Sequence, residues 1–368
     1  MAGSFDCGTL SFELADERSD ADLRALLQDN PMDSWVRVSL AREPSFFLAQ
    51  SLWPHSLVVI ARDRASGNRA AGMYDVGALP IHINGCIKTA GYLGGLRIGR
   101  DYRNKIRFVR TGFDSIAVLG EAVTAGLDCW FTSIAQDNVA ATRLLTAGVP
   151  RLPRYLDVGA MQTLAISTRQ GIRRDLLRPA TPQDIPDLVS FYNRHAAQYN
   201  YSPVLTESWL TALSQTLAVE NFLLLIRDQN IHGCLALWDQ RSMKQTVIEG
   251  YRFPLNLCRL PYNMYAHLRR SVTLPAPGQS IASAFLAFFA LDAEYRQLAV
   301  QVVKDALSRL PKEVDTALIG LSTANPLGAR LLRAVRPQVY ASRIYAVEFS
   351  PNTAEPAGHP AQPEIALL

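Results

Sequence analysis

The chain has 368 residues, of which 48% are hydrophobic and 19% are charged, and its formal net charge at pH 7 is +4. This length predicts two domains or one large domain, and the composition is that of a soluble globular protein with a sizeable core. The small net charge excludes a general nucleic-acid binder, so basic residues are informative only where they cluster.

Other bulk features exclude several kinds of site. The five cysteines lack CxxC spacing and the six histidines lack ligand spacing, which predicts reduced thiols and neither a disulfide framework nor a metal site. The N-terminus shows no signal-peptide pattern, and the longest apolar run, 281–291, is too short to span a bilayer. We therefore expect a cytoplasmic protein with neither DNA nor a membrane as partner. A homodimer is compatible with the sequence.

The first half is predicted to alternate helices and strands. Leu23, Leu26 and Leu27 supply the apolar face of a first helix, and Asn30-Pro31 closes it. A polar turn then joins two apolar runs into a hairpin. In chain order we expect a helix at 16–27, a helical region at 35–53 interrupted by Pro44, strands at 57–61 and 70–79, a turn at 80–85, a strand at 87–98, a helix at 105–125, a strand at 129–134, a helix at 139–145 and a strand at 157–166.

After a polar linker the same order begins again, which predicts a duplicated domain. Tyr295-Arg296 follows an apolar strand as Tyr102-Arg103 does. Asn325 precedes a helix as Asn138 does, and in both helices a small residue and then a Leu-Leu pair follow at the same spacing. In chain order we expect a linker at 169–178, a helix at 182–192, strands at 222–226, 231–237 and 280–291, a helix at 300–310, a strand at 317–321, a helix at 327–335 and a strand at 344–349.

A basic stretch follows the longest predicted strand of the first half. Six basic residues between Arg97 and Arg110 stand against one acid, Asp101. A strand that ends in a loop and opens a helix presents unpaired backbone N–H groups and the positive end of a helix dipole, which together hold phosphate. The alternative is a solvated basic helix face, since Arg103, Arg107 and Arg110 fall on one side. Both interpretations stay open at this point.

The order of elements and two motifs resemble the GNAT superfamily of N-acetyltransferases, arranged as a tandem pair. The stretch LGGLRIGRDYR resembles the central strand of that family with its run-in to the pyrophosphate loop, and residues 138–144 match the start of its second motif. The resemblance implies an α/β (α+β) fold of two tandem GNAT-like domains, each a mixed, mostly antiparallel sheet flanked by helices. The domain at 10–170 would bind the cofactor, the domain at 176–349 would be degenerate, and a flexible tail would follow at 350–368.

The resemblance also implies a site, with acetyl-CoA as cosubstrate. Backbone groups of Leu96 and Ile98 would pair with the pantetheine arm like an added strand. Asn138 would contact the cofactor, although capping its helix is the alternative role. Tyr92 and Ser133 are the candidate catalytic residues, because they lie where the two strands would separate. The residues expected to meet the phosphates are Arg103, Asn104, Lys105, Ile106 and Arg107.

Two features depart from the family pattern. Ile106 and Phe108 stand in the phosphate loop where the family prefers small residues, which let backbone N–H groups close around a pyrophosphate. Leu145 and Leu332 stand where the family often has a tyrosine that protonates the leaving thiolate.

The leading functional prediction is an acetyl-CoA-dependent N-acyltransferase that acts on a small-molecule or peptide amine, or on an amino terminus. The alternative is a degenerate GNAT pair without catalysis that acts as a ligand-binding or interaction module. A third interpretation is aminoacyl transfer from charged tRNA, which would require a broad basic surface and which the modest net charge argues against.

Overall fold

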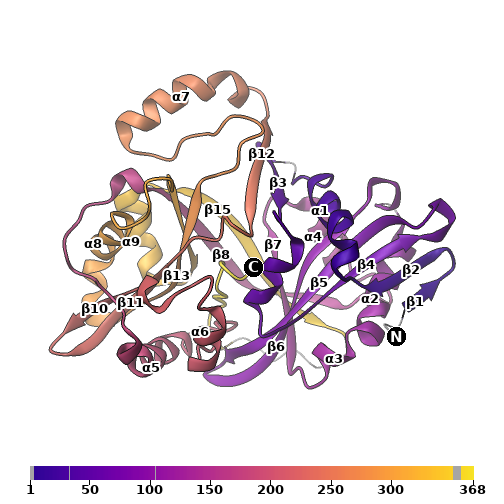
Figure 1. Ribbon diagram of the computed structural model, residues 1–368, viewed down its shortest axis with the longest axis horizontal. Coiled ribbons are helices and arrows are strands. Elements are labelled where there is room, and N and C mark those ends of the chain that lie inside the picture. Colours follow the sequence, from indigo (N-terminus) through magenta and orange to yellow (C-terminus); the bar gives the residue numbers. More distant parts are fainter. Residues whose placement is uncertain (1–3, 33, 104, 351–357) are drawn as a thin grey trace.

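The computed structural model describes residues 4–32, 34–103, 105–350 and 358–368. Within these ranges, thirteen strands form one mostly antiparallel sheet that runs through both halves of the chain, with helices packed on it (Figure 1). The predicted α/β fold class with flanking helices is confirmed.

Most predicted elements of the first half are present, and its strands are longer than predicted. The hairpin and the long strand after it form the centre of this half. The bounds are β1 Ser4–Cys7, β2 Leu10–Leu14, α1 Asp20–Gln28, β3 Val36–Ala41, β4 His55–Asp63, β5 Arg69–Ile83, β6 Cys86–Ile98, α2 Ile106–Leu119, α3 Glu121–Thr124, β7 Cys129–Ala135, α4 Val139–Thr146 and β8 Arg154–Ser167.

The second half repeats this order and adds elements that were not predicted, namely β9, α6, β12 and α7. The bounds are β9 Arg178–Pro179, α5 Ile185–Ala196, α6 Glu207–Leu213, β10 Phe222–Arg227, β11 Asn230–Trp238, β12 Gln245–Tyr251, α7 Leu255–Arg269, β13 Ser283–Leu291, α8 Ala299–Leu307, β14 Thr316–Ser322, α9 Pro326–Val335 and β15 Gln338–Glu348. In the described parts of the chain, no helix is long and apolar enough to cross a membrane.

The two halves exchange their last strands. β8 leaves the first half and pairs with β14, with Ser167 opposite Thr316. β15 leaves the second half and pairs with β7, with Ser342 opposite Ala135. β8 and β15 also pair with each other, so the strand order across the junction is β7-β15-β8-β14. Backbone hydrogen bonds therefore join the halves into one sheet.

The first half packs apolar layers against opposite faces of its part of the sheet. On one face, α2 places Phe108 and Ile116 against Tyr74 of β5. On the other face, α1 places Leu23 against Met73, the neighbour of Tyr74. Successive residues of a strand point to opposite faces, so β5 contributes to both layers.

Two local predictions were wrong. The region 35–53 contains the strand β3 and a short 3-10 helix at Phe46–Leu52. β3 forms because it pairs with β12 of the second half, a partner so distant in sequence that no local pattern reveals it. Pro80, predicted to begin a turn, lies inside β5. β4 pairs with β5 only as far as Ala78. Pro80 lies beyond this point, so its lack of an N–H group removes no hydrogen bond between β4 and β5.

β3 and β12 form a separate two-stranded ribbon. This ribbon leads to α7, which stands apart from the rest of the molecule at the top of Figure 1. The ribbon also joins the two halves, because β3 belongs to the first and β12 to the second.

Candidate functional site

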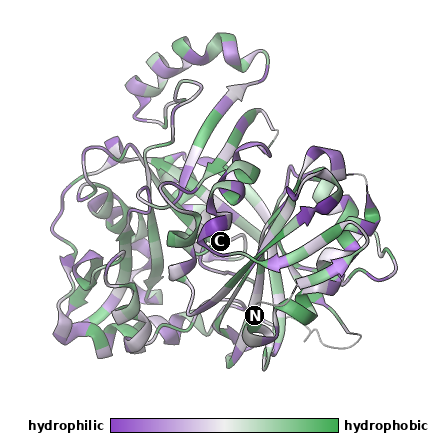
Figure 2. Cartoon of the chain, turned by 45° about the vertical axis from the view of Figure 1, so that its right-hand side comes forward, coloured by the Kyte–Doolittle hydropathy of each residue, from purple (hydrophilic) through white to green (hydrophobic). Residues whose placement is uncertain are grey.

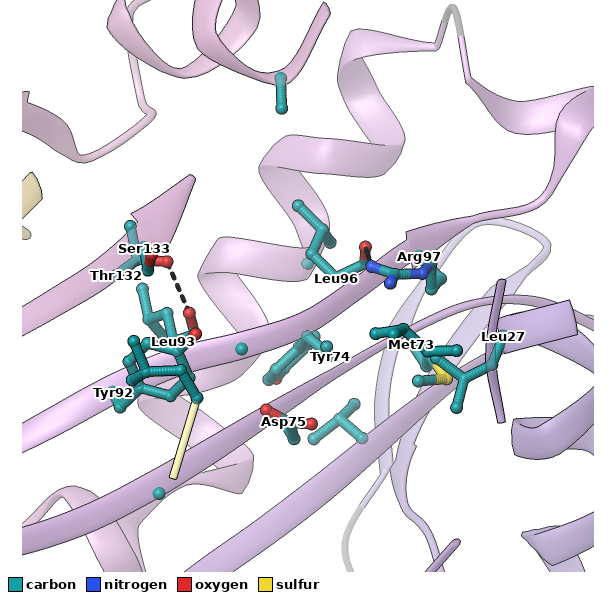
Figure 3. A pocket seen from close by; sticks show the side chains of 18 of the residues that line it. Leu27, Met73, Tyr74, Asp75, Tyr92, Leu93, Leu96, Arg97, Thr132 and Ser133 are labelled. Carbon is teal, nitrogen blue, oxygen red and sulfur yellow. Dashed lines mark hydrogen bonds between the residues drawn. The ribbon is translucent and has the colours of Figure 1, made fainter. Parts of the chain in front are cut away.

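β6 and β7 are parallel neighbours that separate part-way along their length. Their last paired residues are Tyr92 and Phe131. Just beyond this pair, the Thr132 hydroxyl donates a hydrogen bond to the carbonyl of Leu93 at 2.7 Å (Figure 3). β6 continues to Ile98. In the described structure, the edge of β6 that faces β7 therefore has no partner strand over residues 93–98. A gap opens in the sheet there, with backbone groups of β6 along one side.

A bulge in β6 lies beside this gap. The register between β5 and β6 shifts between Met73 and Asp75, and Gly95 has a φ of +59°, a conformation that glycine adopts most easily. A Cβ atom at Gly94 or at Gly95 would lie 2.4 Å from a carboxylate oxygen of Asp75. The two glycines therefore allow the Asp75 carboxylate to lie directly against the β6 backbone.

A cavity of about 310 Å³ surrounds the gap and reaches both faces of the sheet. Tyr74 and Asp75 are neighbours on β5, point to opposite faces, and both line it (Figure 3). On the face that α2 covers, the wall is apolar and includes Phe108, Val109, Phe113 and Ile116. On the opposite face, the wall contains the polar side chains of Arg42, Gln50, Asp75, Tyr92, Arg97 and Lys244.

The polar wall carries more positive than negative charge. Burial raises the pKa of Asp75, although Arg42, Arg97 and Lys244 oppose this shift. Burial, and next the charge of Arg42, lower the pKa of Lys244 to about 7. Burial also lowers the pKa of Arg42 to about 10. Nε of Arg97 is buried and has no hydrogen-bond partner in the described structure. Three cationic side chains thus face one carboxylate, which favours an anionic ligand.

These charged residues come from both halves of the chain. Arg97 was predicted only as the first member of the basic stretch, and Arg42, Asp75 and Lys244 were not predicted as site residues. Arg42 directly follows β3, and Lys244 directly precedes β12, so the ribbon brings the two together. No local pattern reveals this meeting. Asp75 did leave a signal, because a single acid in the apolar run of β5 is unusual for a buried strand.

The two predicted catalytic residues both line the cavity. The ring of Tyr92 stacks on Trp53, with centroids 5.4 Å apart. Burial raises the pKa of Tyr92, so its hydroxyl stays protonated and suits a hydrogen-bond donor, not a base. Ser133 is half-buried on β7, on the other side of the gap (Figure 3).

The residues predicted to hold the cofactor fall into two groups. Leu96, Ile98 and Asn138 line the cavity. Asn138 also caps α4, because its side-chain oxygen accepts a hydrogen bond from the N–H of Ala141 at 3.1 Å, so the alternative role considered for it is present.

The predicted phosphate contacts lie at the start of α2, outside the cavity lining. Arg103 donates to the side-chain oxygen of Asn30 at 2.6 Å, and the Lys105 ammonium lies over the Tyr102 ring. The remaining members of this group are Ile106 and Arg107, which are exposed in the first turn of α2, and Asn104, which lies outside the described residues.

The second half contains the counterpart of this gap, but the end of the chain fills it. β13 and β14 pair only as far as Phe285 and Leu318. Beyond that point, the Glu364 carboxylate accepts a hydrogen bond from the N–H of Phe288 at 2.7 Å. The side-chain oxygen of Gln362 accepts another from the N–H of Ser322 at 2.9 Å. The cavity left at this place measures about 50 Å³.

The tail was predicted to be flexible over 350–368, and its described part, 358–368, corrects this prediction. Ala361, Ala366 and Leu367 are buried, because they fill space that the sheet of the second half leaves open. The carbonyl of Ala366 accepts hydrogen bonds from Gln240 and from Lys244, each at 3.0 Å. Leu367 also lines the first cavity, so the tail connects the two gaps.

Glu364 makes the stability of this arrangement depend on pH. Burial raises the pKa of Glu364 from 4.5 to about 7, so its contribution to stability is complete below about pH 4.5 and is lost as the pH rises through 7. Between about pH 5 and about pH 6.5 we expect the free energy of unfolding to fall by about 1–2 kcal/mol from this group. Lys244 contributes almost nothing to the change in the free energy of unfolding over this pH range. With its pKa lowered to about 7, it is mostly protonated in the folded state as well as in the unfolded state.

The variant Glu364→Gln should lose this slope, because glutamine does not titrate. Urea unfolding at the two pH values measures it, and Glu220→Gln, at an exposed position, is the control that should keep the wild-type slope. An unchanged slope in Glu364→Gln would show that the carboxylate is not buried as described.

Known structures share this fold. The chain is similar to N-myristoyltransferase from Saccharomyces cerevisiae with bound myristoyl-CoA, with a TM-score of 0.62 and 10% sequence identity over 93% of this chain and 83% of that chain. It is also similar to a GCN5-related N-acetyltransferase from Sphaerobacter thermophilus, with a TM-score of 0.50 and 13% identity over 80% of this chain and 81% of that chain. No protein-family model and no curated protein matches the sequence. The chain therefore has the GNAT fold in two GNAT-like halves, as the sequence predicted.

Proposed function

We propose that this double GNAT fold transfers an acyl group from acyl-CoA to an amine, and that the first half holds the reaction. The observation that carries the proposal is the cavity that crosses the sheet where β6 and β7 separate, with an apolar wall on one face and an ionisable wall on the other. A thioester placed in the gap would be reached by an acceptor from the polar face. At the corresponding gap of the second half, the described residues leave a cavity of only about 50 Å³, because Gln362 and Glu364 fill it.

The donor would use features that the first half leaves open. The edge of β6 at 93–98 can pair with the amide groups of a pantetheine arm, with Leu96 and Ile98 at this edge. The start of α2, with Lys105 and Arg107 exposed beside it, suits the phosphates of CoA. The acyl group would lie against the apolar wall near Phe113. Acetyl-CoA is the smallest candidate donor, and the apolar wall also suits longer acyl chains.

The acceptor would enter from the polar face. Its ammonium proton passes to the Asp75 carboxylate, and the free amine then attacks the thioester carbonyl. The C–N bond forms as the C–S bond breaks, and the hydroxyl groups of Tyr92 or Ser133 donate hydrogen bonds to the departing sulfur. The attacking nitrogen gives its second proton to this thiolate, so that an amide and free CoA thiol result. The surplus positive charge of Arg42, Arg97 and Lys244 favours an amine that also carries an anionic group.

Calorimetric titration with acetyl-CoA and with myristoyl-CoA tests the proposal. We expect one site per chain, because among the described residues the gap of the first half is open and that of the second half is filled. The donor with the tighter binding indicates the acyl length. Transfer to an amine is then measured by the release of free CoA thiol. Absence of binding at millimolar ligand, or two equal sites, would contradict the assignment.

A binding module without catalysis is the second candidate. It is favoured by Leu145, which stands at the position of the tyrosine of the family and is buried against Ile134 and Tyr345. This candidate predicts one acyl-CoA site and no release of thiol with any amine.

A further inference from the structure

α7 presents its apolar side chains to solvent. Phe253, just before the helix, and Leu257, Leu260, Met264 and Leu268 recur every three or four residues and so form one stripe along it. Their exposed fractions lie between 66% and 85%. Figure 2 shows hydrophobic and hydrophilic residues alternating along this helix, which stands clear of the main body.

The opposite side of α7 is polar and faces the protein. Asn263 exchanges two hydrogen bonds with the backbone of Leu274, at 2.8 and 2.9 Å. The Tyr262 hydroxyl donates to the carbonyl of Val272 at 3.2 Å, and Ala266 is fully buried. α7 is thus inverted relative to a surface helix of a globular protein, which buries its apolar side. Since its polar side chains hold the returning chain, the helix is fixed with the stripe outward.

The segment that carries the stripe has charge of a single sign. Residues 250–291 contain neither aspartate nor glutamate. They contain four arginines, Arg252, Arg259, Arg269 and Arg270, and this charge is as large as the formal net charge of the whole chain, +4. Arg269 and Arg270 are exposed at the end of the helix. Trp35, which is 65% exposed, lies at its base, because its carbonyl accepts a hydrogen bond from the N–H of Arg252.

We propose that α7 docks on an anionic membrane surface, lying in the plane of the headgroups with the stripe of Phe253, Leu257, Leu260, Met264 and Leu268 in the acyl boundary. An apolar helix face beside arginines and without acids matches the chemistry of such a surface, and tryptophan is enriched at the same depth. The arginine side chains can reach the phosphates while the stripe is buried. This proposal replaces the sequence-based expectation of no membrane partner.

The ribbon connects this surface to the cavity. Arg42 and Lys244 stand at the cavity end of β3 and β12, and α7 begins just beyond the other end of β12. A strand of this length spans about 23 Å. Docking would therefore hold the polar wall of the cavity near the membrane, although the docking itself does not depend on acyl transfer.

Sedimentation of the full chain with vesicles tests the proposal. We expect the protein to pellet with vesicles of equal parts phosphatidylcholine and phosphatidylglycerol, and much less with pure phosphatidylcholine. The double variant Leu260→Glu with Leu268→Glu should bind at least tenfold more weakly. The control Ile87→Glu with Val118→Glu makes the same change of charge at exposed apolar residues on other elements and should bind as the wild type does.

A second variant tests the charge. Arg269→Gln with Arg270→Gln keeps the stripe and should weaken binding to the anionic vesicles by about tenfold or more. Equal pelleting with both lipid compositions, or equal loss in the control variant, would overturn the proposal. Failure of the wild type to pellet with anionic vesicles would also overturn it. If the wild type then self-associates and the stripe variant does not, a second copy of the chain covers the stripe. Circular dichroism of each variant confirms that it is folded.

Discussion

Replacing Asp75 with asparagine is expected to lower kcat for acyl transfer by about 10²–10⁴-fold, the usual contribution of a positioned general base. Asparagine has nearly the same shape, so it can occupy the space that Gly94 and Gly95 leave, but it cannot accept the proton of the ammonium group. Affinity for acyl-CoA should change little, because the predicted donor contacts lie on β6, α2 and α4. Steady-state kinetics with the best donor, together with calorimetric binding of CoA, separates the two effects.

The same substitution leaves three cations without their carboxylate. Removing one partner from a buried charge cluster costs about 3–5 kcal/mol when the others stay charged. Lys244 can reduce this cost by losing its proton, since burial and Arg42 already lower its pKa to about 7. The thermal midpoint must therefore be measured beside the kinetics. Asp187→Asn, at an exposed position in the first turn of α5, is the matched control. It should leave kcat unchanged and cost at most about 1 kcal/mol of stability, the contribution of a carboxylate near a helix N-terminus. Wild-type kcat in a folded Asp75→Asn would exclude Asp75 as the base.

Replacing both Lys105 and Arg107 with alanine is expected to raise the Kd for CoA by about 10–100-fold. Each side chain is exposed at the start of α2, and hydrogen bonds between charged groups contribute about 1.5–3 kcal/mol each, less in solvent. The loss should shrink as salt is added, because screening already weakens the wild-type contacts. Stability should stay near that of the wild type, since neither side chain is buried.

Two further variants decide which half binds the cofactor. Arg330→Ala with Arg333→Ala removes the same charge from exposed positions on α9 and should leave the Kd for CoA unchanged. Arg296→Ala alters the residue of the second half that corresponds to Arg103 and lines the small cavity there. Damage from Arg296→Ala equal to that from the first-half pair would move the cofactor site, or a second one, into the second half.

Arg103 shows why a basic stretch does not by itself indicate which of its side chains are free to bind phosphate. Its place in the basic stretch suggested a free cation, but it donates to Asn30, which follows α1. For Asn138, both predicted roles are compatible with the structure. Its side chain caps α4, and the residue also lines the cavity where the cofactor would bind. A residue type and its spacing indicate what a side chain can do, whereas the neighbours decide what it does.

The sequence by itself determined the order of most elements, the long strand β6, the helix α2 with its basic start, and the recurrence of the pattern in the second half. These features depend on local periodicity and on motifs of a few residues. The GNAT fold and five predicted site residues that line the cavity followed from them, namely Tyr92, Leu96, Ile98, Ser133 and Asn138.

Only the tertiary structure decided the remaining features. The exchange of β8 and β15, the ribbon of β3 and β12, the meeting of Arg42 with Lys244, and the tail in the second gap all join segments far apart in the chain. The outward stripe of α7 is another feature that only the tertiary structure decided. The spacing of its apolar residues predicts an apolar side of a helix, but not whether that side faces the core or the solvent. Pairing and burial are settled by which surfaces meet, and this is a property of the whole chain.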